Sequence, residues 1–146
     1  MKNLVTVIIT TYNRLHFLKN ALTSVLNQSY QNIEIIIVDS SNNAQTQDFI
    51  TENKNLIYIY SDINHPNVLR NLGIQCANGN YIAFLDDDDT WESSKIERQI
   101  NYFNKYDIGL CYTGKNVVSE NNIKYSFKNG IFKSTKQSIL WDNFIG

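Results

Sequence analysis

The stretch Leu-Val-Thr-Val-Ile-Ile at residues 4–9 is a short run of apolar and β-branched residues near the start of the chain. Three similar runs follow it, at Ile33–Val38, Leu56–Tyr60 and Tyr81–Leu85, with starts 23–29 residues apart. Each run is nearly continuous in apolar residues, which is typical of strands covered on both faces in a parallel sheet. The four runs therefore predict four parallel strands.

The segments between these runs carry helical patterns. In the first segment apolar residues recur at helical spacing, at Leu15, Leu18, Leu22, Val25 and Leu26. Leu69, Leu72 and Cys76 predict another helix, with Gly79 at its C-cap, and Phe49 and Ile50 indicate a shorter one. The alternation predicts an α/β fold, with a mostly parallel, Rossmann-like sheet and helices on both faces.

Beyond the fourth run the pattern is less regular. Trp91, Ile96, Ile100 and Phe103 predict one more helix, and Ile108–Tyr112 predicts a fifth strand. A hairpin is expected from Tyr125–Phe127 and Ile131–Phe132, which flank the turn signal Lys-Asn-Gly at residues 128–130. A last helix is expected over Ser134–Phe144.

Composition and charge exclude several classes of protein. The chain has 146 residues, of which 42% are hydrophobic and 18% charged, so one ordinary domain with a real core is expected. A net charge of −1 argues against a nucleic-acid partner. The N-terminal apolar run is too short for a signal peptide, and Cys76 and Cys111 lack metal-ligand spacing. We expect a cytoplasmic protein in which both cysteines are reduced core residues.

Polar residues follow all four predicted strands. They are Thr10–Arg14, Asp39–Asn42, Asp62 and Asp86–Asp89. The carboxyl ends of parallel strands lie at one edge of the sheet, where ligands of open α/β folds bind. We therefore expect these groups to converge on one site.

The four aspartates at residues 86–89 are the most informative of these groups. Carboxylates about 5 Å apart repel by about 3 kcal/mol at an effective dielectric of about 20, so a positive group is expected among them. Mg²⁺ or Mn²⁺ fits this requirement, with Asp86 and Asp88 aimed at the ion and positions left open for phosphate oxygens. A helix start is the alternative reading, and it explains only Asp89, which precedes Glu92 at capping-box spacing.

The other candidates each have a structural alternative. Tyr12 offers a flat face to a base and Arg14 a charge to a phosphate, unless the segment is only a turn in which Asn13 caps the next helix. Asp39 can accept hydrogen bonds from a ribose or a base, or serve as a turn residue. Arg70 can reach a diphosphate or be a solvated charge. Gly73, in the same helix, indicates close packing.

Taken in order, these segments resemble the inverting family-2 glycosyltransferases of the GT-A fold over about the first 113 residues. The segments are Val5–Arg14, Glu34–Asp39, Arg70–Ile74 and Ala77–Asp89, the last of which leads into a DxD motif. The resemblance implies a nucleotide-sugar donor, most simply a UDP-sugar, and a glycan or lipid-linked acceptor. It also implies that the protein can associate with the membrane surface.

The resemblance also implies roles for individual residues. Asp86 and Asp88 would hold Mn²⁺ or Mg²⁺, which stabilises the departing diphosphate as a Lewis acid. The donor would be bound by Thr10, Tyr12, Arg14, Asp39, Arg70, Asp86 and Asp87. The family usually has Pro where Thr10 stands and a second Asp where Ser40 stands. Because that Asp reads the base in some members, Ser40 leaves the identity of the base open.

The resemblance divides the chain into residues 1–113, a nucleotide-sugar-binding half, and residues 114–146, the start of an acceptor-side half that is apparently truncated. Inversion needs a general base near the acceptor hydroxyl, and we expect it beyond Gly146. Asp142, on the predicted last helix, is a poor candidate.

Two other functions remain open from the sequence. One is a non-catalytic module that binds a nucleotide-sugar, because no base is identified in the chain. The other is a haloacid-dehalogenase-type phosphatase, because Phe84–Thr90 fits the pattern hhhhDxDxT, where h is apolar. That motif normally follows the first strand of its domain, whereas here it follows the fourth.

Overall fold

The computed structural model describes residues 3–53, 55–118 and 124–127. The helices and strands within these ranges are β1 (Val5–Thr11), α1 (Leu15–Leu26), β2 (Ile33–Asp39), α2 (Gln45–Thr51), β3 (Ile57–Tyr60), α3 (Pro66–Cys76), β4 (Tyr81–Asp86), α4 (Lys95–Lys105), β5 (Lys115–Val118) and β6 (Lys124–Phe127). The chain divides into two compact units, Met1–Ile96 and Glu97–Gly146.

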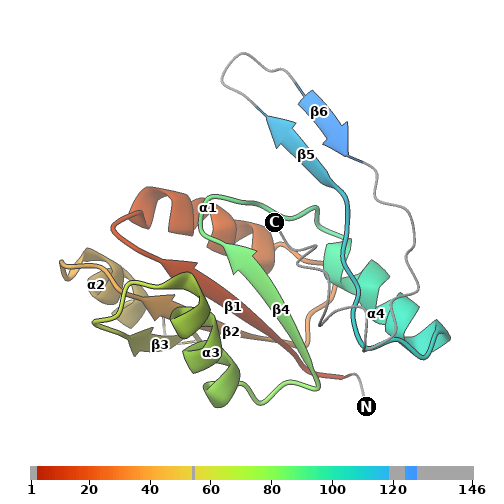
Figure 1. Cartoon of the computed structure of the whole chain (residues 1–146), viewed down its shortest axis with the longest axis horizontal. Helices are drawn as coiled ribbons and strands as arrows, with labels where there is room; N and C mark the ends of the chain where they lie inside the picture. The colour runs from red at the N-terminus through yellow and green to blue at the C-terminus, as the bar shows by residue number, and fades with distance from the viewer. Residues whose placement is uncertain (1–2, 54, 119–123, 128–146) are drawn as a thin grey trace. The chain divides into compact units, whose positions relative to one another are not determined.

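The first unit contains a four-stranded parallel sheet in the order β3-β2-β1-β4. The predicted parallel α/β fold is therefore confirmed. From β1 the chain adds β2 and then β3 on one side, and it returns to add β4 on the other side (Figure 1). This reversal creates a topological switch point between the carboxyl ends of β1 and β4, where Thr10 pairs in register with Asp86.

Helices cover both faces of the sheet, as the sequence predicts (Figure 1). On one face α1 buries Leu18, Ala21, Leu22 and Val25. On the other face Leu69 of α3 packs in a cluster with Ile8, Ile36 and Val38. A Cβ on Gly73 would lie 2.6 Å from Cγ2 of Ile8, so this glycine allows α3 to approach β1 closely and the prediction of close packing is confirmed.

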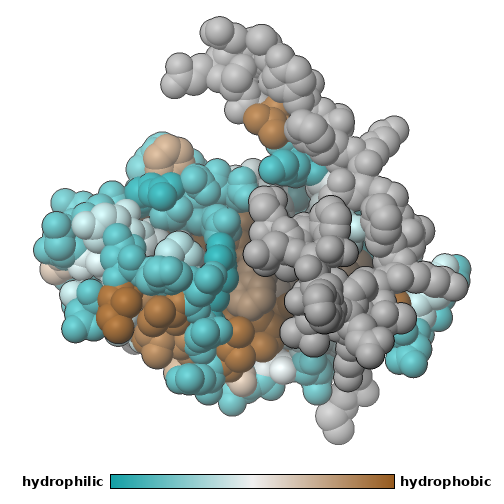
Figure 2. All heavy atoms as spheres, in the orientation of Figure 1, coloured by the Kyte–Doolittle hydropathy of each residue, from teal (hydrophilic) through white to brown (hydrophobic). Residues whose placement is uncertain are grey.

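The central strands are buried on both faces, but β4 is not. In β1 and β2 nearly every residue is buried, whereas Ile82 and Phe84 of β4 are 40% and 45% exposed. The same holds for β3, where Ile57 and Tyr60 are 37% and 57% exposed. The expectation of burial on both faces is therefore wrong for β3 and β4, which are the edge strands of this sheet. Figure 2 shows apolar atoms on the face of the molecule where α3 and β4 lie.

Gly79 and Cys76 do not have the predicted roles. The helix α3 ends at Cys76, and its C-cap is Ala77, whose ψ of 132° takes the backbone out of the helical region. A Cβ on Gly79 would lie 2.6 Å from the backbone nitrogen of Thr6, so close approach and not capping explains the glycine. Cys76 is free but exposed, because the buried side of α3 runs through Leu69 and Gly73.

The segment after β4 is held by the end of α1. Asp89 lies in a turn, with its N–H donating to the carbonyl of Asp86 at 3.1 Å, and α4 begins only at Lys95, so the predicted cap at Asp89 is wrong. Gln28 is 2% exposed; its Nε2 donates to the carbonyls of Ser24 and Glu92, and its Oε1 accepts from the N–H of Ile96 at 3.0 Å.

In the second unit the predicted fifth strand is wrong. Residues 108–112, interrupted by Gly109, form no regular structure. The strand β5 lies further along and pairs antiparallel with β6, so a strand at Tyr125–Phe127 is confirmed but with a different partner. The predicted turn at residues 128–130, the strand Ile131–Phe132 and the last helix lie outside the described residues. No described helix is long and apolar enough to cross a membrane.

Candidate functional site

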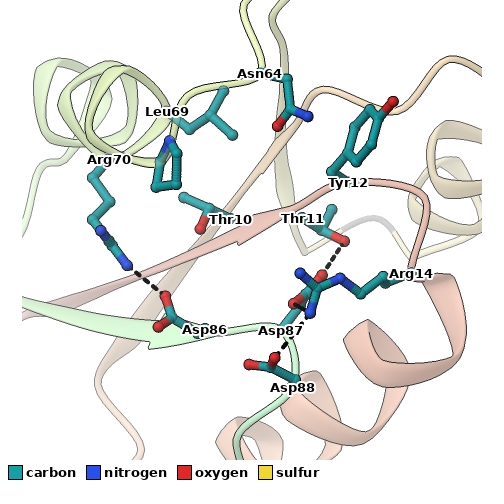
Figure 3. A pocket seen from close by; sticks show the side chains of 11 residues that line it. Thr10, Thr11, Tyr12, Arg14, Asn64, Leu69, Arg70, Asp86, Asp87 and Asp88 are labelled. Carbon is teal, nitrogen blue, oxygen red and sulfur yellow. Dashed lines mark hydrogen bonds and ion pairs between the residues drawn. The ribbon is translucent and has the colours of Figure 1, made fainter. Parts of the chain in front are cut away.

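A pocket of about 210 Å³ opens at the carboxyl ends of β1 and β4, beside the start of α3 (Figure 3). Its lining comes from four segments of the first unit and consists of Thr10, Thr11, Tyr12, Arg14, Asn64, Pro66, Leu69, Arg70, Asp86, Asp87 and Asp88. Seven of the eight predicted site residues are among them. The exception is Asp39. The pocket lies at the switch point of the sheet, which is where the topology places a ligand site.

Arg14 connects the loop after β1 to the turn after β4. Its Nη1 lies 2.8 Å from Oδ2 of Asp88 and 3.4 Å from Oδ1 of Asp87. The side chains of Arg14 and Asp88 are each about half exposed, at 48% and 52%. Solvent therefore screens their attraction, and both groups are accessible to a ligand.

Arg70 makes the matching contact on the other side of the pocket. From α3 its Nη2 donates to Oδ1 of Asp86 at 2.7 Å. Two guanidinium groups thus face three carboxylates across the pocket (Figure 3). Guanidinium groups bind phosphate oxygens well, and carboxylates bind hard cations, so the lining can receive a diphosphate together with a divalent ion.

Asp87 is the buried member of the acidic run, with Thr11 as its main partner. The hydroxyl of Thr11 donates to Oδ2 of Asp87 at 2.8 Å. Burial raises the pKa of Asp87, and the hydrogen bond from Thr11 and the charge of Arg14 offset this only in part. Asp87 therefore anchors the turn to the end of β1, while Asp86 and Asp88 remain more exposed.

The structure places Asp39 beneath the surface and outside the pocket lining. Its carboxylate is fully buried and accepts from the N–H and the hydroxyl of Ser41, at 2.8 and 2.5 Å. The hydroxyl of Tyr58 donates to the other carboxylate oxygen at 3.0 Å. Burial, followed by this bond to Asp39, raises the pKa of Tyr58. These contacts fix the turn that ends β2.

Asn13 is not the helix cap that the sequence allowed. The residue at the N-cap of α1 is Arg14, and Asn13 adopts a left-handed backbone with φ of 54°. Its side-chain oxygen accepts from the backbone of Asn42 and the amide of Asn43, and its own N–H donates to Ser41. The loops after β1 and β2 are therefore joined next to Tyr12.

Three lining residues were missed by the sequence analysis, Asn64, Pro66 and Leu69, and Thr11 was included only in the run Thr10–Arg14, without a role of its own. Asn64 follows β3, so the rule that polar residues after strands converge applies to it as well. Its amide oxygen accepts from the hydroxyl of Ser40 at 3.2 Å. Thr11 is a buried strand residue, and only the contact with Asp87 reveals its role.

The family model for glycosyl transferase family 2 matches residues 6–145. The chain belongs to this family. The expected family is confirmed, and the phosphatase alternative is wrong. Relatives that match the chain are named glycosyltransferases, which also favours a transferase over a non-catalytic module.

One relative is UDP-Glc:alpha-D-GlcNAc-diphosphoundecaprenol beta-1,3-glucosyltransferase WfaP of Escherichia coli, 37% identical over 113 residues, with 75% of this chain and 45% of the relative covered. Two solved structures, each with a TM-score of 0.63, cover 70% of the chain. S. aureus TarS 1-349 in complex with UDP-GlcNAc is 25% identical, with 31% of that chain covered. The mannosyltransferase PcManGT from Pyrobaculum calidifontis, in complex with GDP-Man and Mn2+, is 19% identical, with 33% covered.

These comparisons confirm the GT-A fold. They also show that the chain spans only part of its relatives. It covers between 17% and 49% of the length of eight curated glycosyltransferases that it matches.

The side chains of this family-2 chain suit a hard divalent cation. Asp86 and Asp88 are half exposed, and each has one oxygen in contact with an arginine. Among the described residues no group of three or more His, Cys, Asp or Glu side chains could enclose a metal ion. An ion here would have two protein carboxylates at most, and its remaining positions suit phosphate oxygens or water.

Proposed function

We propose that the pocket binds the nucleoside diphosphate of a sugar donor, in the first instance a UDP-sugar. The observation that supports this proposal best is the placement of the aromatic and charged side chains in the pocket. The ring of Tyr12, 39% exposed, lies on one side of the pocket, and Asp86 and Asp88, each paired with an arginine, lie on the opposite side (Figure 3). An aromatic face suits a base and the charged side suits a diphosphate, so the ligand would extend from Tyr12 toward the turn after β4.

We infer further that the protein transfers the sugar with inversion to a glycan or lipid-linked acceptor. WfaP carries in its name both a UDP-sugar donor and a diphosphoundecaprenol acceptor, and this relative supports the same classes of substrate here. TarS, at 25% identity, was solved with UDP-GlcNAc, which supports the uridine donor. We also expect residues 114–146 to belong to the acceptor side, and a cytoplasmic location for the reaction.

The described side chains would orient the donor and hold its charge. Arg14 and Arg70 would donate to diphosphate oxygens, while Asp86 and Asp88 would bind Mn²⁺ or Mg²⁺. The bound ion supplies Lewis-acid stabilisation of the leaving diphosphate. Asp87, bonded to Thr11, keeps the turn that carries both metal ligands in place beside β1. Asp39 would act indirectly, by fixing the loop next to Tyr12.

Calorimetric titration with UDP, GDP and dTDP, each with and without Mn²⁺, tests this proposal. We expect UDP to bind more tightly when Mn²⁺ is present, and Asp88→Ala to abolish that difference. Asp48→Ala, which removes an exposed carboxylate on α2, is the matched control and should leave it unchanged. Metal-independent binding that is equal in wild type and Asp88→Ala would contradict the proposed site.

A further inference from the structure

The helix α4 carries two tyrosines and two cations along one exposed side. Their spacing places them on one stripe, and they are Arg98, Tyr102, Lys105 and Tyr106. The N–H of Tyr106 donates to the carbonyl of Tyr102 at 2.9 Å, so the helical turn continues to this last member. The tyrosines are each 43% exposed, whereas Ile100 on the opposite side of the helix is buried. The protein thus buries the apolar side of α4 and leaves an aromatic and cationic side in solvent.

The two tyrosine rings are held in place at the surface. Their centroids lie 5.7 Å apart with an angle of 25° between the planes, which is a stacked arrangement. Nζ of Lys105 lies 5.3 Å from the centroid of the Tyr106 ring, within reach of a cation–π interaction. Tyrosine combines an apolar ring with a polar hydroxyl, and this combination suits the boundary between water and lipid.

The segment that follows α4 adds two more large exposed side chains. Nε2 of Gln99 donates to the carbonyl of Cys111 at 3.1 Å, which holds residues 108–112 to the helix. Within this segment Leu110 and Tyr112 are exposed. Four large side chains, three of them tyrosines, are therefore exposed over a short stretch of the second unit.

Charge is divided unevenly between the two units of the chain. Residues 97–146 contain seven Lys or Arg and four Asp or Glu, a net charge of +3, whereas residues 1–96 have a net charge of −4. A cationic segment in a chain that is acidic elsewhere favours an anionic partner. The exposed aromatic and apolar side chains beside the cations favour lipid over nucleic acid, because a bilayer offers them an apolar boundary in addition to its phosphates.

We propose that the exposed side of α4, together with residues 108–112, is a docking surface for an anionic lipid bilayer. Arg98 and Lys105 pair with lipid phosphates, and the rings of Tyr102 and Tyr106 enter the interfacial layer. This rests on the proposed function and deepens it, because a lipid-linked acceptor is carried by a membrane. WfaP, whose name includes a diphosphoundecaprenol acceptor, supports that class of acceptor.

Sedimentation of the full chain with lipid vesicles tests this surface. One set of vesicles contains equal parts of phosphatidylglycerol and phosphatidylcholine, and the other contains phosphatidylcholine alone. Wild type should partition onto the anionic vesicles about tenfold more strongly than onto the neutral ones, and added NaCl should reduce the difference by screening the charges. The experiment needs no nucleotide, so its result is independent of the assignment of the donor pocket.

Two variants locate the contact on the chain. Lys105→Gln should lower partitioning onto the anionic vesicles about fivefold, and Lys19→Gln makes the same change on the exposed side of α1 as its control. Tyr102→Ser should also lower it about fivefold, because less apolar area leaves water. Its control is Tyr60→Ser, at an exposed position of β3. Calorimetric titration of Lys105→Gln with UDP and Mn²⁺ should match wild type, which separates this surface from the donor pocket.

Three results would overturn the inference. If wild type stays in solution with both kinds of vesicle, or binds the two equally, the chain has no surface for anionic lipid. If the two variants partition as strongly as their controls, the contact with lipid lies elsewhere on the chain. If wild type prefers a DNA duplex to the vesicles and Lys105→Gln loses this preference, the surface binds nucleic acid instead.

Discussion

Nη1 of Arg14 lies 2.8 Å from Oδ2 of Asp88, so the loop after β1 supplies a positive charge to the acidic turn after β4. Arg70 does the same for Asp86 from α3, at 2.7 Å. The repulsion among neighbouring carboxylates that led us to expect a cation is therefore met in the protein itself by two arginines. A divalent ion that binds Asp86 and Asp88 would take over this role, and the arginines would then be available to the diphosphate.

Replacing Arg14 should therefore have opposite effects on the two ligands. In Arg14→Gln we expect Mn²⁺ alone to bind about fivefold more tightly, because a cation no longer stands beside Asp88. UDP should bind more weakly in the presence of Mn²⁺, because a phosphate donor is lost. Titrations followed by the electron paramagnetic resonance of free Mn²⁺ and by calorimetry measure both effects. Lys19→Gln, on the exposed side of α1, is the charge-matched control. If Arg14→Gln bound Mn²⁺ more weakly than wild type, Arg14 and the ion would not compete for Asp88.

Asp87→Asn should retain or increase stability at neutral pH. Because burial raises the pKa of Asp87 above its ordinary value of 3.8, the fold favours the protonated side chain. Its stabilising contribution is fully present below that ordinary value and is lost as the pH rises through the pKa of the folded state. Asparagine carries no charge and keeps an acceptor for Thr11, so it should remove this loss.

Urea unfolding of wild type and Asp87→Asn at several pH values between about 4 and neutral tests the direction of this pH dependence. The difference in unfolding free energy should grow in favour of the variant as the pH increases. Asp48→Asn, which makes the same change at an exposed position on α2, is the matched control. A variant that loses stability as the pH rises would show that the ionised carboxylate is favoured in the fold.

The sequence predicted the strands correctly where a continuous apolar run is also buried in the folded protein. Continuous apolar runs become β1 and β2 because both faces of a central strand are covered. The same rule fails at Ile108–Tyr112, where Gly109 interrupts the run and Leu110 and Tyr112 are exposed. Apolar content alone does not provide a strand with a hydrogen-bonding partner.

The site could be predicted as a collection of residues but not as a set of contacts. The order of strands brings Thr10 opposite Asp86, which follows from topology. The burial of Asp39 under Ser41 and Tyr58 does not follow from it, because a residue at the end of a strand can point to either side of the turn. The bond from Ser40 to Asn64 joins two loops that are distant in sequence, and no local pattern encodes it.

The side chain of Gln28, which lies just after the end of α1, should contribute strongly to the stability of the fold. Its side chain binds the carbonyls of Ser24 and Glu92 and the N–H of Ile96 in a buried setting. Gln28→Ala leaves these backbone groups without their partner, and we expect a loss of about 3 kcal/mol in the free energy of unfolding. Gln31→Ala, at a nearby exposed position, should lose much less. Equal losses in the two variants, measured by urea unfolding, would show that Gln28 is not the link to the segment before α4.

Gly79→Ala should destabilise the first unit through a clash at the start of β1. The added Cβ would lie 2.6 Å from both the backbone nitrogen and Oγ1 of Thr6, and backbone atoms cannot move away as a flexible side chain can. The same hydroxyl accepts from the N–H of Gly79 at 2.9 Å and donates to Glu34 at 2.6 Å, so a shift would strain both hydrogen bonds.

We expect Gly79→Ala to lower the free energy of unfolding by about 2 kcal/mol or more, in the range seen when side chains are forced into packed sites. Gly109→Ala makes the same chemical change where a Cβ would meet nothing within 4 Å, and it should be close to neutral. Thermal unfolding of both variants beside wild type measures the contrast. A Gly79→Ala protein as stable as Gly109→Ala would mean that β1 and the segment before β4 are not packed as closely as the distance to Thr6 requires.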